Sequence, residues 1–183
     1  MAGRCETSKL TPSVSDAERL VLEPTAVTAV SPSGEAASTG EARLGGGAIL
    51  FAKFAPSIPK EAVVVEAYLL FQRAGDDTNV PPFSLHARPV LEDWDSGSIR
   101  HSHVPPLGLS HGAETRVFDL SPRTIRVDVL DIVRKWQSGA RPLGIAVEVE
   151  GAASSHGGAP FVLVPRREAH ASVFGPRLEV YLR

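Results

Sequence analysis

The chain is short of cysteine, of aromatic residues and of long hydrophobic runs, and each shortage excludes a class of protein. Its 183 residues include a single cysteine, Cys5, so no disulfide can form within the chain. Aromatic side chains make up only 6% of the residues, too few for an extended stacking platform. No apolar run approaches the roughly 20 residues that a membrane-spanning helix needs. We therefore predict no membrane span.

An excess of charge of one sign is also missing. The 19 lysines and arginines nearly balance the 21 aspartates and glutamates, for a formal net charge of −2. Because nucleic-acid-binding chains usually carry a basic patch or stripe, we predict no nucleic-acid partner. The first residues, MAGRCETSKL, lack an apolar signal-peptide core. The sequence leaves the localisation open, because either secretion does not use that route or the native N-terminus differs.

Turn-forming residues are plentiful, with 16 glycines and 15 prolines. Between these turns the apolar residues repeat with a period of two, which predicts antiparallel strands with one buried face. The predicted strands are residues 20–30, 47–55, 61–73, 83–92, 114–120, 143–150, 160–165 and 177–183.

Three of these strands show the alternation most clearly. The inward positions are Val63, Val65, Ala67, Leu69 and Phe71 in the first, Leu143, Ile145, Val147 and Val149 in the second, and Leu178, Val180 and Leu182 in the third. The outward positions of the last two strands are Glu148, Glu150, Arg177, Glu179, Tyr181 and Arg183.

One segment has helical rather than strand spacing. In RVDVLDIVRKWQSG the apolar residues fall at 129, 130, 132, 133 and 136, which predicts a short helix over residues 127–138 with Trp136 in the core. Many short strands with one helix predict an all-β fold, a jelly-roll β-sandwich of antiparallel strands. We expect one domain over residues 20–183, after a flexible N-terminal tail of residues 1–19.

The order of these segments resembles the DNRLRE domain, a family first noted in disaggregatase-related proteins and grouped with carbohydrate-binding modules. The resemblance begins in GGAILFAKFAPSIPKEAVVVEAYLLF and continues through the Trp-Asp motif of PVLEDWDSGSI. VDVLDIVRKWQSG comes next in the family's order. The more specific segments, taken together, are the three that follow it: LGIAVEV, VPRREAH and GPRLEVYLR. A more distant similarity is to the helix-containing sandwich of growth-factor propeptides.

The resemblance implies a jelly roll with a non-catalytic role, at the cell surface or attached to polysaccharide-active enzymes. Its implied partners are a polysaccharide, including acidic ones, or a protein surface. An extracellular location is implied in the same way.

Trp94 and its neighbours are the main candidates for ligand binding. An exposed indole offers an apolar face to a sugar ring, and the flanking carboxylates of Asp93 and Asp95 can bind hydroxyl groups. Arg88, in the preceding strand, adds a guanidinium, whose planar fork suits carboxylate or sulfate groups. The alternative, which we favour for the indole, is that Trp94 folds back over the end of the sandwich and is buried.

A His-x-His pair, His101 and His103, completes the candidate ligand-binding set. On a strand both imidazoles would point the same way and could hold a metal ion. The similar cupin pattern also needs a glycine and a glutamate at set distances, which this loop lacks, so we assign no metal ligand.

Two groups of carboxylate and amide side chains could hold a structural calcium ion. Such clusters more commonly form turns, and we expect no other cofactor. The two groups are Asp76, Asp77 and Asn79, and Asp93 and Asp95.

The residues support two hypotheses of function. The first is a non-catalytic module for carbohydrate binding or cell-surface adhesion. The second is a structural or assembly protein that docks into a larger particle, filament or coat, with self-association. No nucleophile has a catalytic setting, since Cys5 lies in the tail and no Ser–His pair has a recognisable setting. A metal-dependent enzyme of cupin type would depend on the His-x-His pair alone, and we predict that the protein is not an enzyme.

Overall fold

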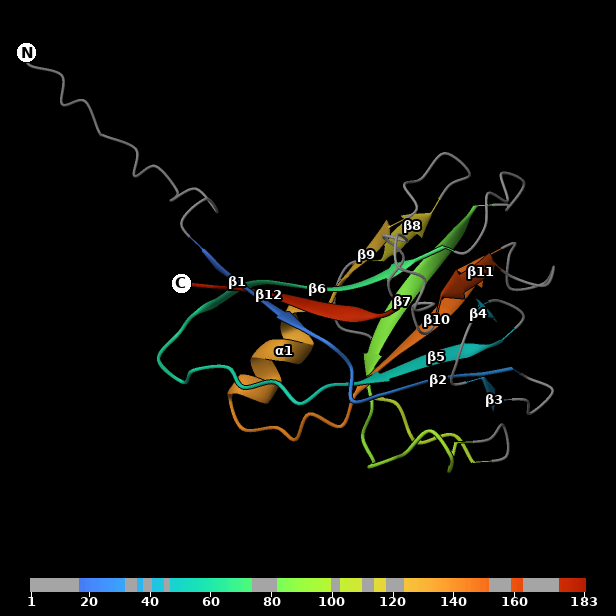
Figure 1. The fold of residues 1–183 in the computed structure, drawn as a ribbon, viewed down its shortest axis with the longest axis horizontal. Coiled ribbons are helices and arrows are strands. Elements are labelled where there is room, and N and C mark those ends of the chain that lie inside the picture. Colours follow the sequence, from blue (N-terminus) through green and yellow to red (C-terminus); the bar gives the residue numbers. More distant parts are fainter. Residues whose placement is uncertain are drawn as a thin grey trace, which may run out of the picture.

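The residues that the structure describes form a sandwich of two antiparallel sheets with one short helix (Figure 1). The computed structural model describes residues 17–31, 36–37, 41–44, 47–73, 82–99, 103–109, 114–117, 124–151, 159–162 and 175–183. Most residues in these ranges belong to strands, which confirms the predicted all-β class.

The first sheet has four strands in the order β1-β12-β6-β9. Strand β12 pairs with β1 on one side and with β6 on the other, so the first and last strands of the chain lie side by side. The strands are β1 (Glu18–Leu22), β12 (Arg177–Leu182), β6 (Val64–Gln72) and β9 (Thr124–Asp128).

The second sheet has six strands in the order β3-β2-β5-β10-β7-β8. They are β3 (Ala36–Ala37), β2 (Ala26–Val30), β5 (Ile49–Lys53), β10 (Ile145–Gly151), β7 (Phe83–Pro89) and β8 (Thr115–Val117). A separate pair consists of β4 (Glu41–Leu44) and β11 (Ala159–Val162).

Eight of these strands give the jelly-roll topology. In chain order they are β1, β5, β6, β7, β8, β9, β10 and β12. One sheet contains the first, third, sixth and eighth of them, as neighbours in the order β1-β12-β6-β9. The other contains the second, fourth, fifth and seventh, in the order β5-β10-β7-β8. This double Greek-key arrangement confirms the predicted jelly roll. Strand β2 is an addition at the edge of β5.

The predicted strand over residues 20–30 is divided between the two sheets. Pro24 has no N–H to donate to a ladder, and around it the chain leaves the four-stranded sheet and enters the six-stranded one. The first strand also begins earlier than predicted, because Glu18 and Arg19, assigned to the tail, pair with β12.

The main core lies between the sheets and is made by alternating side chains. The inward positions predicted for the last strand, Leu178, Val180 and Leu182, all belong to it. Trp136 of the helix also belongs to it, with 8% of its surface exposed, as predicted. The period-two pattern therefore identified the buried face correctly over most of the sandwich.

The pattern failed at the start of β6. Val64 is buried, whereas Val63, predicted to point inward, is 58% exposed, and Val65 is only partly buried. The register of β6 against β12 shifts at this point. A β-bulge inserts one extra residue and so moves the following side chains to the opposite face, which is why strict alternation gave the wrong face here.

The helix α1 (Leu130–Gln137) is shorter than the predicted 127–138, because the residues before it end strand β9. The carboxylate of Asp128 accepts a hydrogen bond from the first helical N–H at 2.9 Å. Arg134 donates from Nε and Nη2 to the carbonyl oxygen of Val64, at 3.2 and 3.0 Å. The two bonds from Arg134 attach the helix to the start of β6.

A second hydrophobic cluster covers half of the outer face of the six-stranded sheet. Residues from the segment that follows β7 fold over strands β2, β5 and β10 and bury side chains that alternate with those of the main core. The buried members are Val30, Phe51, Val90, Trp94, Ile99 and Ala146. The rest of this outer face carries polar side chains of β7 and β10.

Candidate functional site

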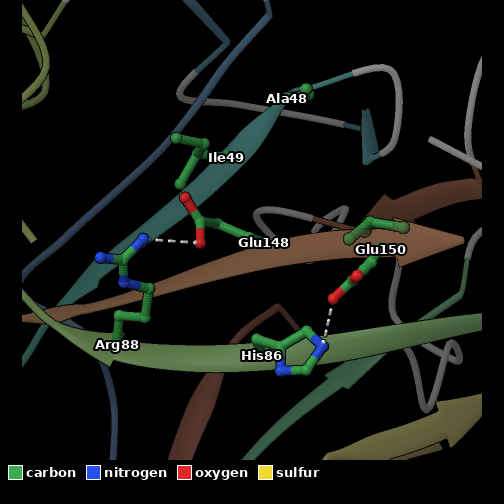
Figure 2. A pocket seen from close by; sticks show the side chains of 8 residues that line it. Ala48, Ile49, His86, Arg88, Glu148 and Glu150 are labelled. Atoms are coloured by element: carbon green, nitrogen blue, oxygen red, sulfur yellow. Dashed lines mark hydrogen bonds and ion pairs between the residues drawn. The ribbon is translucent and has the colours of Figure 1, made fainter. Parts of the chain in front are cut away.

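The outer-face cavity, of about 330 Å³, lies on the polar half of the six-stranded sheet, over β5, β10 and β7 (Figure 2). This volume is at the lower end of the roughly 300–1,000 Å³ typical of small-molecule sites. The lining residues are Gly47, Ala48, Ile49, His86, Arg88, Glu148, Val149 and Glu150. Most of them occupy outward positions of rigid strands, so the sheet itself sets their spacing.

Arg88 and Glu148 form an ion pair across two neighbouring strands. Arg88 Nη1 donates to Glu148 Oε2 at 3.1 Å, and its Nε donates to the carbonyl oxygen of Gly108 at 2.8 Å. These bonds use two of the five N–H groups of the guanidinium. Both side chains are about one-third exposed, at 31% and 32%. The pair is therefore held in place and still accessible from the cavity.

His86 and Glu150 form a second pair beside the first. His86 Nε2 lies 3.0 Å from Glu150 Oε2, and the Glu150 side chain is 78% exposed (Figure 2). Nε2 itself is buried, and among the described residues no group makes an aligned hydrogen bond to it. A buried polar atom without a hydrogen bond costs free energy, so Nε2 is the unsatisfied group of this pair.

A third polar group continues this surface on β7 and β8. Ser84 donates from its hydroxyl to Glu114, and Arg116 Nε donates to the same carboxylate at 3.3 Å. The hydrogen bond from Ser84, followed by that from Arg116, lowers the pKa of Glu114. Glu114 therefore stays ionised to a lower pH than a free glutamate does.

The structure does not bring the predicted ligand-binding residues together into one site. Arg88 lines the cavity. Trp94, Asp93 and Asp95 belong to the segment that covers the other half of the sheet, and His103 is exposed. His101 lies outside the described residues.

Trp94 is buried, as the favoured interpretation expects, and its ring is not available to stack on a sugar. It is 6% exposed, its Nε1 donates to Leu143 O at 2.8 Å, and its ring meets Phe51 edge to face at 5.8 Å. Gly144 has a φ of +127°, and a Cβ there would lie 3.0 Å from Trp94 Nε1. A glycine is needed at this position for both reasons.

Asp93 and Asp95 hold the chain around Trp94. Asp93 accepts from Lys53 Nζ and from the N–H of Trp94, the latter at 3.0 Å. Asp95 accepts from the N–H groups of Gly97 and Ser98 at 2.8 and 2.9 Å, an Asx turn. The structure thus gives both carboxylates a part in shaping this segment.

The bonds to Asp93 predict a pH-dependent stability. The hydrogen bond from Lys53 and that from the backbone of Trp94 lower the pKa of Asp93. A carboxylate with a lowered folded-state pKa adds stability above the unfolded value of about 3.9 and loses it as the pH falls through the folded value. We expect Asp93→Asn to lower the melting temperature near neutral pH, and to lower it less near about pH 3.

Circular dichroism melts of the wild type and Asp93→Asn at both pH values measure this difference. Glu92→Gln, a change at the exposed neighbouring carboxylate, is the matched control and should give a smaller effect. An equal loss for Asp93→Asn at both pH values would contradict the assigned role.

The described residues form no cluster that supports the calcium or the His-x-His metal hypothesis. In these ranges no three His, Cys, Asp or Glu side chains gather closely enough to hold an ion. Asp76, Asp77 and Asn79 fall outside them.

The sequence missed three polar residues of the cavity, His86, Glu148 and Glu150, as members of a site. The alternation did place Glu148 and Glu150 outward, and it puts His86 and Arg88 on one face of their strand. What the sequence lacked was the pairing of β7 with β10, which sets Glu148 opposite His86.

In comparisons with known proteins, no family model and no curated sequence matches this chain. Among the helices of the described residues, none has the length and apolar character needed to cross a membrane.

Proposed function

We propose that this protein is a non-catalytic binding module that holds carbohydrate in the outer-face cavity. The observation that carries the proposal is that one cavity on a rigid sheet holds basic side chains beside carboxylates: Arg88 Nη1 bonds to Glu148, and His86 Nε2 lies 3.0 Å from Glu150 Oε2. Sugar hydroxyls both donate and accept hydrogen bonds, so a surface that offers both kinds of group suits them.

The rest of the lining supports the same class of ligand. Gly47, Ala48 and Ile49 form an aliphatic side of the cavity, suited to the C–H face of a sugar ring. Among the described residues no phenylalanine, tyrosine or tryptophan ring lines the cavity, so binding would depend on hydrogen bonds, and on charge-assisted ones above all. The resemblance to the DNRLRE family points to a polysaccharide as well.

The positions of the two carboxylates favour binding over glycoside hydrolysis. Glycosidases place their two carboxyl groups on either side of the scissile bond. Glu148 and Glu150 lie two residues apart on one strand and share its outward face. Both would therefore approach a bound sugar from the same side, and each is already paired with a basic side chain.

Affinity gel electrophoresis in dextran, alginate or dextran sulfate tests the proposal, since the three polymers are neutral, carboxylated and sulfated. We expect at least one of them to retard the wild-type protein. Arg88→Ala should weaken that retardation at least about ten-fold, because a hydrogen bond to a charged group contributes about 1.5–3 kcal/mol and about 1.4 kcal/mol corresponds to a factor of ten.

The control is Lys60→Ala, which also removes one positive charge but at an exposed turn between β5 and β6. It should be retarded like the wild type, and thermal melts should show that both variants are folded. The proposal is overturned if no polymer retards the wild type, or if Arg88→Ala and Lys60→Ala behave alike.

A further inference from the structure

We infer that the binding surface extends beyond the cavity along β7 and takes an internal stretch of a linear polysaccharide rather than a single sugar or a chain end. The inference rests on the proposed function and specifies its ligand. The observation behind it is a continuous row of polar side chains that is longer than the cavity itself.

Strand β7 forms the floor of this row. Its outward residues Ser84, His86 and Arg88 follow one another at alternate positions. Two residues of an antiparallel strand advance about 6.8 Å, so the row covers about 14 Å from the first of these residues to the last. This length exceeds one sugar ring.

The neighbouring strands widen the row into a polar track. On one side β10 sets Glu150 opposite Ser84 and Glu148 opposite His86. On the other side β8 sets Arg116 opposite Ser84. Because neighbouring strands lie about 4.8 Å apart, side chains at paired positions can contact the same ligand.

The far end of the track lies outside the cavity but offers the same chemistry. Glu114 and Arg116 are 38% and 71% exposed and are joined at 3.3 Å, and Ser84 donates to the same carboxylate. Neither charged residue lines the cavity. The track therefore has an ion pair at its β8 end that matches the Arg88–Glu148 pair at its other end.

At the Arg88 end the surface becomes aliphatic. The carbonyl oxygen of Gly108 accepts from Arg88 Nε, and the next residue, Leu109, is 76% exposed. Leu91 lies beside Gly108, since a Cβ built on that glycine would be 3.4 Å from Leu91 Cδ2, and Leu91 is 54% exposed. A polysaccharide chain that continues past Arg88 would meet these side chains with its C–H faces.

The test compares Arg116→Ala with Arg88→Ala and Lys60→Ala, using whichever of dextran, alginate and dextran sulfate retards the wild type. We expect Arg116→Ala to weaken retardation by the polymer several-fold. The disaccharide of the same polymer, added as a competitor, should bind Arg116→Ala and the wild type equally, because a short ligand fills only the cavity. Arg88→Ala should weaken binding of both.

Two results overturn the inference while leaving the proposed function intact. One is retardation of Arg116→Ala equal to that of the wild type and of Lys60→Ala. The other is a disaccharide that competes as well as the polymer at equal sugar concentration. Failure of the wild type to bind any of the three polymers overturns both the function and the inference. Since Arg116 is well exposed, Arg116→Ala is expected to fold, and a thermal melt verifies this.

Discussion

Trp94→Ala is expected to lower the free energy of unfolding by about 3–5 kcal/mol, the range for removing a large aromatic side chain from a core. The indole is 6% exposed and sits in the second hydrophobic cluster, on the outer face of the six-stranded sheet. It packs edge to face on Phe51 and donates a hydrogen bond to Leu143 O at 2.8 Å. Urea denaturation followed by far-ultraviolet circular dichroism measures the loss.

The size of this effect follows from what Trp94 joins together. Lys53 Nζ donates both to Asp93 and to the carbonyl oxygen of Trp94, the latter at 3.0 Å, and lies 5.9 Å from the centre of the indole ring. The ring is thus a main attachment of the covering segment to β5 and to the chain before β10. Removing it leaves a cavity and also loosens this attachment.

Trp94→Phe is the control for the hydrogen bond. It keeps an aromatic ring in the cluster but leaves the acceptor at Leu143 without its indole donor, at a cost of about 1–3 kcal/mol. Because Trp94 does not line the outer-face cavity, this variant should bind polysaccharide as the wild type does. A loss below about 1 kcal/mol for Trp94→Ala would contradict the burial described above.

Glu179→Ala is expected to cost about 2–4 kcal/mol, although its strand position faces outward. Its carboxylate is only 2% exposed and accepts from Arg19 and from Tyr181, the latter at 3.2 Å. Arg177 and Arg126 approach it at 3.2 and 3.6 Å. Breaking a buried ion pair costs about 3–5 kcal/mol, and the value here is lower because Arg19 and Arg126 are half exposed and solvated.

Glu179→Gln measures how much of the loss comes from removing the negative charge. Glu66→Gln measures the effect of removing a charge elsewhere on the same face. The first keeps an acceptor oxygen but removes the charge, so we expect it to retain part of the lost stability. Glu66 is half-buried on the same outer face and shares a hydrogen bond with Tyr68, but among the described contacts it forms no ion pair with these arginines, so we expect its change to cost less than Glu179→Ala. Chemical denaturation of all three variants gives the comparison, and equal losses for Glu179→Ala and Glu66→Gln would contradict the assigned role.

The sequence predicted the sandwich well because strand alternation is a local signal. Leu178, Val180 and Leu182 point inward as their spacing requires, and Trp136 lies in the core as the helical spacing requires. The failures have local causes that the pattern does not contain. A bulge reverses the facing of Val63 and Val65, and Pro24 divides one apparent strand between two sheets.

The candidate site was predicted much less well. Of the predicted ligand-binding residues, Arg88 lines the cavity, while Trp94 is buried elsewhere on the same face. In the sequence, a tryptophan between acidic residues is equally compatible with an exposed ring that stacks on a ligand and with a buried ring. The difference depends on whether the chain folds back over the sheet, and this depends on contacts with Phe51 and Leu143, more than 40 residues away in the sequence.

By itself the sequence determined the all-β class, the single helix and the inward face of most strands, because these follow from residue spacing within one segment. Only the tertiary structure decided which polar side chains share a cavity. Arg88 meets Glu148, and His86 meets Glu150, because β7 and β10 are neighbours in one particular register. A shift of that register by one residue would turn these side chains to the opposite face, and no local pattern in either strand sets it.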